Sequence, residues 1–261
     1  MNNLLLYTFL SVAIISCNST PFPENGTWVD LTHSFSSETV VWPTSDPFSL
    51  DTLFTGYTDA GFYYESYKFS AAEHGGTHLD APVHFSEGKK RVHEIEIETL
   101  TGNAVVIDVS NKVENNRDYQ IMPDDILEWE RSYGRLPDHS ILLFRTGFGE
   151  FWPDAEKYLG TNEKGQEALK DLSFPGIHPE TADWLLENRK IKAIGLDTAS
   201  LDYGKSTDFL THQKLFEENI PGFENVANLD KLSPSGAYVI ALPMKIRNGS
   251  GAPLRIVAYL P

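Results

Sequence analysis

Three short apolar runs, separated by helix-like segments, constrain the fold of this chain more than any other feature. The runs lie at residues 104–109 (AVVIDV), 140–144 (SILLF) and 191–196 (IKAIGL). Each has the length of a strand and is almost wholly apolar, which is typical of strands that are buried on both faces. The intervening and following pattern predicts helices at residues 123–133, 178–188 and 211–218. This alternation over residues 104–218 predicts an α/β domain with a mixed sheet and flanking helices.

Both ends of the chain are richer in strand patterns. Strands are predicted near residues 29–31, 62–69, 236–242 and 254–260. The total length of 261 residues suits one large domain or at most two small ones. No glycine-rich phosphate loop follows a strand, and this argues against a nucleotide cofactor.

The first 17 residues are predicted to be a leader, not part of the fold. Residues 4–16 are almost wholly apolar but shorter than the roughly 20 residues of a membrane span, which favours a signal peptide over an uncleaved anchor. Residues 18–25 are predicted to be a linker, and residues 26–261 the folded domain. Either cleavage releases a secreted protein, or Cys17 ends a segment that resembles a lipobox and is lipid-anchored to the cell envelope. The position of Cys17 favours the second fate, whereas the absence of Lys or Arg before the apolar run counts against both.

The overall charge excludes one class of partner. The net charge is -16, from 21 basic and 37 acidic residues. Nucleic-acid binding needs a basic patch, so no nucleic-acid partner is expected. Membrane contact is expected only through a lipid on Cys17.

The residues suited to chemistry concentrate in the segment 73–85, EHGGTHLDAPVHF. His74, His78 and Asp80 offer the nitrogen and oxygen ligands that zinc, manganese and iron use in proteins. Three such ligands can hold one side of a metal and leave positions open for a water that becomes a nucleophile near neutral pH. His84 can pass protons, because the ordinary pKa of histidine lies near neutrality. The segment therefore predicts a catalytic metal site.

The backbone of this segment is not predicted to be helical. Gly75, Gly76 and Pro82 disfavour a helix, so a loop or strand end is expected, with the glycines letting the backbone bend tightly around an ion. If residues 79–84 are extended, Asp80 and His84 point the same way. A second pair, His212 and Glu224, lies much later in the chain, and the residues alone do not mark this pair as functional.

The run from His74 to His84 resembles the H-x-G-T-H-x-D-x-P-x-H motif of the cyclase family, which includes bacterial-type kynurenine formamidases and isatin hydrolases. Further segments extend the resemblance over roughly residues 26–261. In order, these are Asp30–His33, Trp42-Pro43, Asp46-Pro47, Arg145–Gly147, Phe174–Gly176, Gly195–Thr198, His212, Glu224-Asn225, Asn228-Leu229, and Gly249–Pro253 with Arg255.

The resemblance implies a swivelling β/β/α domain that forms homo-oligomers and binds one or two divalent ions, Zn²⁺ or Mn²⁺. His74, His78 and Asp80 would bind the first ion, and Asp80 would bridge to a second where one exists. His212 would bind the second ion, and Glu224 would contact one or both.

The resemblance also implies an activity. His84 would donate and accept protons, and Trp42 would border the substrate. The reaction would be cleavage of a carbon–nitrogen bond in a small aryl amide or lactam, such as N-formylkynurenine or isatin, by metal-bound hydroxide. The segments HGGTHLDAP and GSGAP resemble those of the isatin hydrolases more closely than those of the kynurenine formamidases. An exported leader also departs from the cytosolic setting of tryptophan degradation, which weakens the formamidase assignment.

Two other interpretations remain open from the residues. The chain could be a secreted, non-catalytic protein that binds a metal or a small molecule on the same scaffold. A serine hydrolase is disfavoured, because the G-x-S-x-G turn of that class is absent.

Overall fold

The computed structural model describes residue 22 and residues 25–261. The predicted leader of residues 1–17, with Cys17, lies outside the described residues, as do most residues of the predicted linker. Among the described helices, none is both long and apolar enough to cross a membrane.

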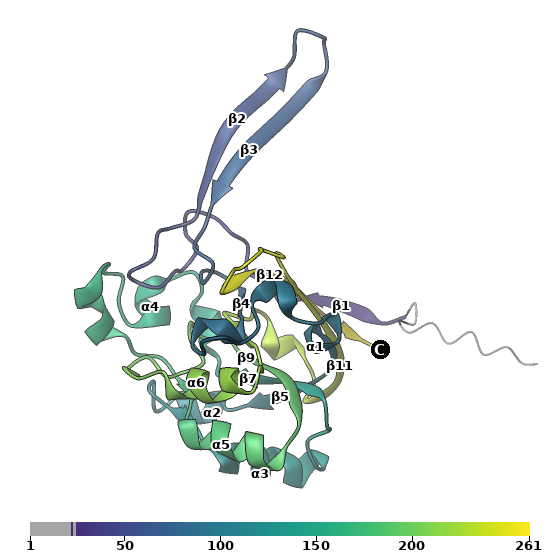
Figure 1. Ribbon diagram of the computed structural model, residues 1–261, viewed down its shortest axis with the longest axis vertical. Coiled ribbons are helices and arrows are strands. Elements are labelled where there is room, and N and C mark those ends of the chain that lie inside the picture. Colours follow the sequence, from purple (N-terminus) through teal and green to yellow (C-terminus); the bar gives the residue numbers. More distant parts are fainter. Residues whose placement is uncertain (1–21, 23–24) are drawn as a thin grey trace, which may run out of the picture.

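Regular elements run from Thr27 to Leu260 (Figure 1). The strands are β1 (Thr27–Asp30), β2 (Ser49–Tyr57), β3 (Tyr63–Ser70), β4 (His78–Asp80), β5 (Thr101–Asp108), β6 (Gln120–Ile121), β7 (Ser140–Arg145), β8 (Gly176–Ile177), β9 (Ile191–Leu196), β10 (Gly222–Glu224), β11 (Ser235–Pro243) and β12 (Gly251–Leu260). The α-helices are α1 (Ile97–Leu100), α2 (Ser110–Val113), α3 (Pro123–Tyr133), α4 (Ala155–Leu159), α5 (Pro179–Asn188) and α6 (Leu210–Glu217). The strands and helices predicted between residues 104 and 218 are confirmed to within a few residues.

Eight strands form the main sheet, in the order β1-β12-β11-β5-β7-β9-β10-β4. Strands β5, β7, β9 and β10 run parallel to one another, and the remaining pairs are antiparallel. Strand β12 also pairs with β4, with Gly251 opposite Asp80, so the sheet closes on itself. This closed mixed sheet with flanking helices confirms the predicted fold class.

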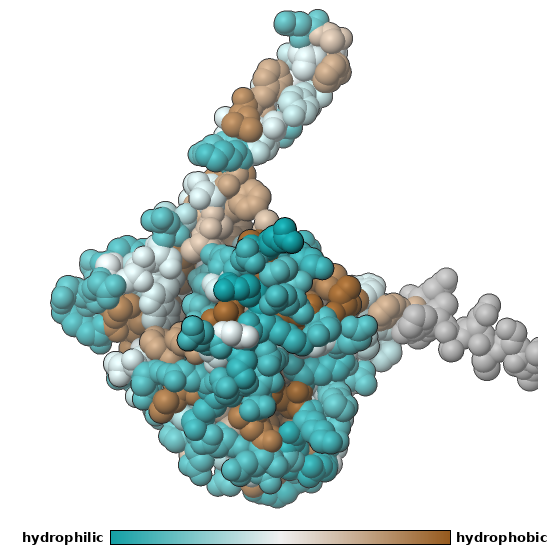
Figure 2. All heavy atoms as spheres, viewed as in Figure 1, coloured by the Kyte–Doolittle hydropathy of each residue, from teal (hydrophilic) through white to brown (hydrophobic). Residues whose placement is uncertain are grey.

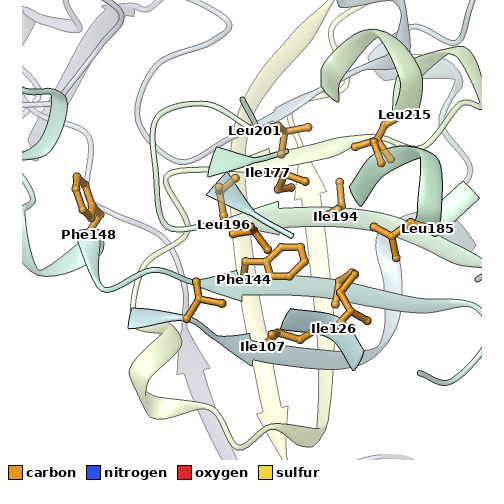
Figure 3. Packing of buried hydrophobic residues seen from close by; sticks show 14 of the residues in the cluster. Ile107, Ile126, Phe144, Phe148, Ile177, Leu185, Ile194, Leu196, Leu201 and Leu215 are labelled. Carbon is orange, nitrogen blue, oxygen red and sulfur yellow. The ribbon is translucent and has the colours of Figure 1, made fainter. Parts of the chain in front are cut away.

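The continuous apolar runs of the sequence are explained by burial on both faces of the parallel strands. Phe144 and Ile107 pack outward against residues of helices α3, α5 and α6, among them Ile126 (Figure 3). Their neighbours Leu143 and Val106 pack into the enclosed side of the sheet. A strand covered on both sides carries apolar residues at successive positions, not only at alternate ones.

Strands β2 and β3 form a hairpin that extends away from the body of the molecule (Figure 1). Strand β3 covers the predicted strand at residues 62–69, whereas β2 has no counterpart in the sequence prediction. At the base of the hairpin, the ring of Phe48 stacks on that of Phe69 with centroids 6.2 Å apart. We call the hairpin, residues 49–70, the arm.

Candidate metal centre

The pairing of two short strands assembles the centre. Strands β4 and β10 are antiparallel, and their register places His78 opposite Glu224. Helix α6 contributes His212, and the loop before β4 contributes His74. Together with Asp80, these residues form what we call the acid–histidine cluster (His74, His78, Asp80, His212 and Glu224). The fold thus brings His212 and Glu224 to the residues of the sequence motif.

A glycine turn shapes the loop between His74 and His78. Gly76 has a φ of 63°, in the left-handed region that favours glycine, and a Cβ at this position would lie 2.6 Å from Cζ of Phe35. The prediction that a glycine lets the backbone bend here is therefore confirmed at Gly76. The neighbouring Gly75 forms an isolated antiparallel bridge with Val41, which brings the segment that carries Trp42 beside the loop.

The carboxylate of Asp80 lies between the histidines of the cluster. Its Oδ1 is 2.6 Å from Nδ1 of His74 and 3.0 Å from Nε2 of His78. Its Oδ2 is 3.4 Å from Nε2 of His212. Each carboxylate oxygen therefore faces a different part of the cluster.

Glu224 is shared in the same way. Its Oε2 is 3.4 Å from Nε2 of His78, and its Oε1 is 3.0 Å from Nε2 of His212. Two overlapping groups result, His74–His78–Asp80 and Asp80–His212–Glu224, and the possible ligand atoms of each group lie within 4.8 Å of one another. This arrangement can hold one cation in each group with Asp80 between them.

The hydrogen bonds of His78 and His74 fix which ring nitrogen carries the proton. Nδ1 of His78 lies 2.9 Å from the carbonyl oxygen of Gly76, which can only accept, so this nitrogen donates. Nε2 of His74 lies 3.0 Å from the hydroxyl oxygen of Ser250, and that hydroxyl donates to Glu73 at 2.6 Å. When either ring is neutral, its unprotonated nitrogen is therefore the one that faces the carboxylate of Asp80 and is free to bind a cation.

The ring of His212 is oriented in a similar way by Asp202, a residue that the sequence did not mark as functional. Its Nδ1 lies 2.6 Å from Oδ2 of Asp202, while Nε2 faces the cluster. Asp202 also accepts the backbone N–H groups of Thr211 and His212, both at 3.1 Å. A carboxylate behind a histidine is the usual support for a metal-ligating imidazole. Asp202 lies ten residues before His212 in the sequence, and no motif there indicates this supporting role.

The two buried carboxylates of the cluster, Asp80 and Glu224, favour positive charge beside them. Burial lowers the pKa of His78, but Asp80 and Glu224 outweigh this effect and raise the pKa to about 10. Nε2 of His78 is buried and has no hydrogen-bond partner among the described residues. Either protons on the rings or a bound cation can supply this positive charge, and ring nitrogens together with carboxylate oxygens are a donor set that fits a divalent metal ion.

His84 lies at the edge of the cluster, although not by the predicted route. Residues 79–84 are not continuously extended, because β4 ends at Asp80 and Pro82–His84 forms a 3₁₀ helix. Pro82 begins that turn, where its fixed φ is favourable. Nε2 of His84 nevertheless lies 4.0 Å from Oδ2 of Asp80. Burial lowers the pKa of His84 to about 4, so the ring is neutral at pH 7.

A cavity of about 250 Å³ opens beside the cluster. It is lined by Trp42, Ser45, His74, Asp80, His84, Phe85, Ala199, Ser200, Phe209, His212 and Glu224. Trp42, Phe85 and Phe209 supply aromatic walls. The contact of Trp42 with a substrate, which the family resemblance implies, stays a prediction. The volume is slightly below the roughly 300–1,000 Å³ typical of pockets for drug-sized ligands, so it suits a small molecule.

Comparisons with known proteins agree with this geometry. Residues 29–203 match the family described as "Putative cyclase". The chain is 31% identical to isatin hydrolase of Roseibium aggregatum over 72% of each chain. It is 28% identical to kynurenine formamidase of Bacillus anthracis over 88% of this chain and 96% of the relative.

A solved structure gives the same result. Isatin hydrolase A from Ralstonia solanacearum superimposes with a TM-score of 0.81 at 32% identity, over 91% of this chain and 93% of that one. The sequence motif, the closed mixed sheet and these relatives lead to one conclusion: the chain belongs to the cyclase family.

Proposed function

We propose that this chain is a metal-dependent hydrolase that cleaves the carbon–nitrogen bond of a small aryl amide or lactam, such as N-formylkynurenine or isatin. One observation carries the proposal: ring nitrogens of three histidines and two carboxylates converge beside a cavity with aromatic walls. The isatin hydrolase and the kynurenine formamidase among its relatives support this class of substrate.

The cluster would hold Zn²⁺ or Mn²⁺. His74, His78 and Asp80 form the first site, and Asp80 with His212 and Glu224 forms a second. A bound divalent ion polarises a carbonyl and lowers the pKa of a water molecule beside it.

The chain's own residues perform the remaining tasks. Trp42, Phe85 and Phe209 hold the aryl ring, so that the amide carbonyl lies next to the cluster. His84, neutral at pH 7, takes a proton from the attacking water as the new carbon–oxygen bond forms. It then returns that proton to the departing nitrogen as the carbon–nitrogen bond breaks, which leaves a carboxylic acid and a free amine.

The predicted leader supports a proposal for the location of the protein, and the family resemblance supports one for its assembly. We place the protein outside the cytoplasm, either secreted or held at the envelope by a lipid on Cys17, and assembled as a homo-oligomer. Cell fractionation of the unmodified chain and of a Cys17→Ser variant distinguishes the two locations, because only a lipidated form depends on the thiol.

The activity is tested by stripping the protein with a chelator and adding back Zn²⁺ or Mn²⁺ separately. Hydrolysis of isatin and of N-formylkynurenine is then followed by absorbance. We expect turnover of at least one substrate, and only after metal is restored. If the restored protein binds metal but hydrolyses neither compound, nor other small amides or lactones, the non-catalytic interpretation is correct instead.

A further inference from the structure

Glu73 and Ser250 form a polar pair beside the cluster that the proposed reaction does not use. Figure 2 shows a body whose surface is mostly hydrophilic on the face in view, with exposed apolar side chains gathered along the arm. Most acidic side chains of such a protein lie in water, but Glu73 is partly buried. Glu73 lies in the loop before β4, and Ser250 comes just before β12. The two residues meet because β12 pairs with β4.

Two hydrogen bonds hold the carboxylate of Glu73 on Ser250. The backbone N–H of Ser250 donates to Oε2 of Glu73 at 3.0 Å, and the Ser250 hydroxyl donates to the same oxygen at 2.6 Å. The carboxylate forms no ion pair with a Lys or Arg among the residues that the structure describes. Burying a carboxylate that is held by neutral donors alone costs free energy, so this contact calls for a functional explanation.

The hydrogen bonds between Glu73 and His74 have one direction. A carboxylate only accepts, so the hydroxyl hydrogen of Ser250 points to Glu73 and the hydroxyl oxygen is left to accept. Nε2 of His74 lies 3.0 Å from that oxygen and must therefore carry a proton. We call the three groups Glu73, Ser250 and His74 the relay. A neutral ring with its proton on Nε2 offers Nδ1 to a cation, and this Nδ1 lies 2.6 Å from Oδ1 of Asp80.

His74 differs in this respect from the other two histidines of the cluster. His78 and His212 both direct Nε2 at the carboxylates, and their Nδ1 atoms lie at hydrogen-bond distance from the carbonyl oxygen of Gly76 and the carboxylate of Asp202. A histidine presents one nitrogen or the other according to the hydrogen bond that its second nitrogen makes. The opposite orientation of His74 therefore requires an acceptor on its Nε2 side, and the relay supplies one.

Two glycines that flank Ser250 give the relay its space. A Cβ at Gly249 would lie 2.7 Å from Oε1 of Glu73, and a Cβ at Gly251 would lie 2.5 Å from Cε1 of His74. Neither glycine has a left-handed φ, so the close approach of the neighbouring side chains, not the backbone conformation, requires glycine here. The Gly-Ser-Gly order thus lets one hydroxyl reach a carboxylate and an imidazole together.

We propose that Glu73 is a positioning residue that acts through Ser250 to keep the proton of His74 on Nε2, and so to present Nδ1 to the metal ion. The inference rests on the proposed metal binding but on no particular substrate. Carboxylates that orient a metal-ligating imidazole are known to raise metal affinity, and here a hydroxyl transmits the effect. Because the ring of His84 stacks on that of His74, the relay also steadies the group that moves the proton.

The first test measures Zn²⁺ affinity in competition with a chromophoric chelator, and it compares two serines in matched contacts. Ser250→Ala removes the hydroxyl of the relay. Ser110→Ala is the control, because the N–H and hydroxyl of Ser110 donate to Oδ1 of Asp108 at 2.9 and 2.6 Å, outside the cluster. We expect the affinity to fall about 10–100-fold in Ser250→Ala and to change less than about twofold in Ser110→Ala. Equal affinities in the two variants overturn the proposal.

The second test separates positioning from a merely structural role. NMR of the Zn²⁺-loaded protein, with nitrogen-15 in its histidines, follows the Nε2–H group of His74. We expect a slowly exchanging signal in the unmodified protein and in Glu73→Gln, whose amide oxygen can still accept from Ser250. Glu73→Leu and Ser250→Ala should lose the signal, and Glu73→Leu should also lose metal affinity that Glu73→Gln keeps.

Two results of the NMR measurement overturn the proposal. One is that Nε2 of His74 is the metal-bound nitrogen in the unmodified protein, a result that does not depend on how any variant folds. The other is that Ser250→Ala loses affinity while its Nε2–H signal persists, since the loss is then structural. Neither test needs a substrate, so failure of the relay is distinguishable from failure of the proposed hydrolysis.

Discussion

The imidazole rings of His84 and His74 stack with their centroids 3.7 Å apart and their planes at 14° to each other. The stack holds the ring of His84 over the cluster without making it part of either group of possible ligands. A ring fixed in this way can reach a reacting group in the cavity while the cluster stays intact.

Replacing His84 should therefore separate chemistry from metal binding. We expect His84→Gln to lower kcat by about 10²–10⁴-fold, the usual range for a lost general acid–base group. Metal content, measured by atomic emission, should not change. His139→Asn is the control, because His139 is exposed and lies before β7, away from the cluster. Loss of metal in His84→Gln would show that His84 is a ligand.

Asp202 is predicted to set metal affinity through His212. In Asp202→Asn, the side chain can no longer accept at both the backbone N–H and Nδ1 of His212, so the ring loses its fixed orientation. We expect metal affinity to fall about 10–100-fold in competition with a chromophoric chelator. Asp183→Asn is the control. Asp183 pairs at 2.7 Å with Lys214, which lies on the same helix as His212, and its replacement should leave the metal affinity unchanged. Equal affinities in all three proteins would contradict this role.

The motif was readable from sequence because its residues are close along the chain, whereas the rest of the centre was not. Glu224 reaches the cluster through the pairing of β10 with β4, a contact between strands more than 140 residues apart, and His212 reaches it from helix α6. Asp202 sits in a loop with no periodic pattern. Buried strands such as β7 were predicted because apolar runs mark burial on both faces, but β2 alternates weakly, and its residues are mostly exposed in the hairpin that it forms with β3.

Gly76 is predicted to be essential for the geometry of the loop. Gly76→Ala adds a methyl group 2.6 Å from Phe35 and keeps an unfavourable φ of 63°. Gly88→Ala has the same backbone strain, with a φ of 77°, but meets open space. We expect Gly88→Ala to cost about 1–2 kcal/mol of unfolding free energy in urea, and Gly76→Ala to cost more and to lower metal content. Equal losses of stability would show that Phe35 moves aside freely.

His33 should make stability depend on pH. Its ring stacks on Trp152 at 4.2 Å, beside a separate cavity of about 450 Å³, and Nε2 has no hydrogen-bond partner among the described residues. Burial lowers the pKa of His33 from 6.5 to about 4. The unfolded chain therefore binds this proton first, so stability is complete above pH 6.5 and is lost as pH falls toward 4.

The size of this effect is measured against His33→Phe, which keeps the ring and removes the titration. Between pH 7.5 and pH 4.5 the unmodified protein should lose about 1–3 kcal/mol more unfolding free energy than the variant, after allowance for solvent screening. Parallel curves of unfolding free energy against pH for the two proteins would mean that His33 titrates normally.

The closure of the sheet has a consequence for how the protein matures. Strand β4 is held between β10 and β12, with His78 opposite both Glu224 and Pro253. A chain emerges from a ribosome or a translocation pore with its N-terminus first. His74, His78 and Asp80 are therefore released long before the residues of β12, which lie near the C-terminus. Ion capture by the finished geometry must therefore wait until the last strand has been delivered. The compartment in which the C-terminus arrives, not the one in which synthesis begins, then decides which metal the protein acquires.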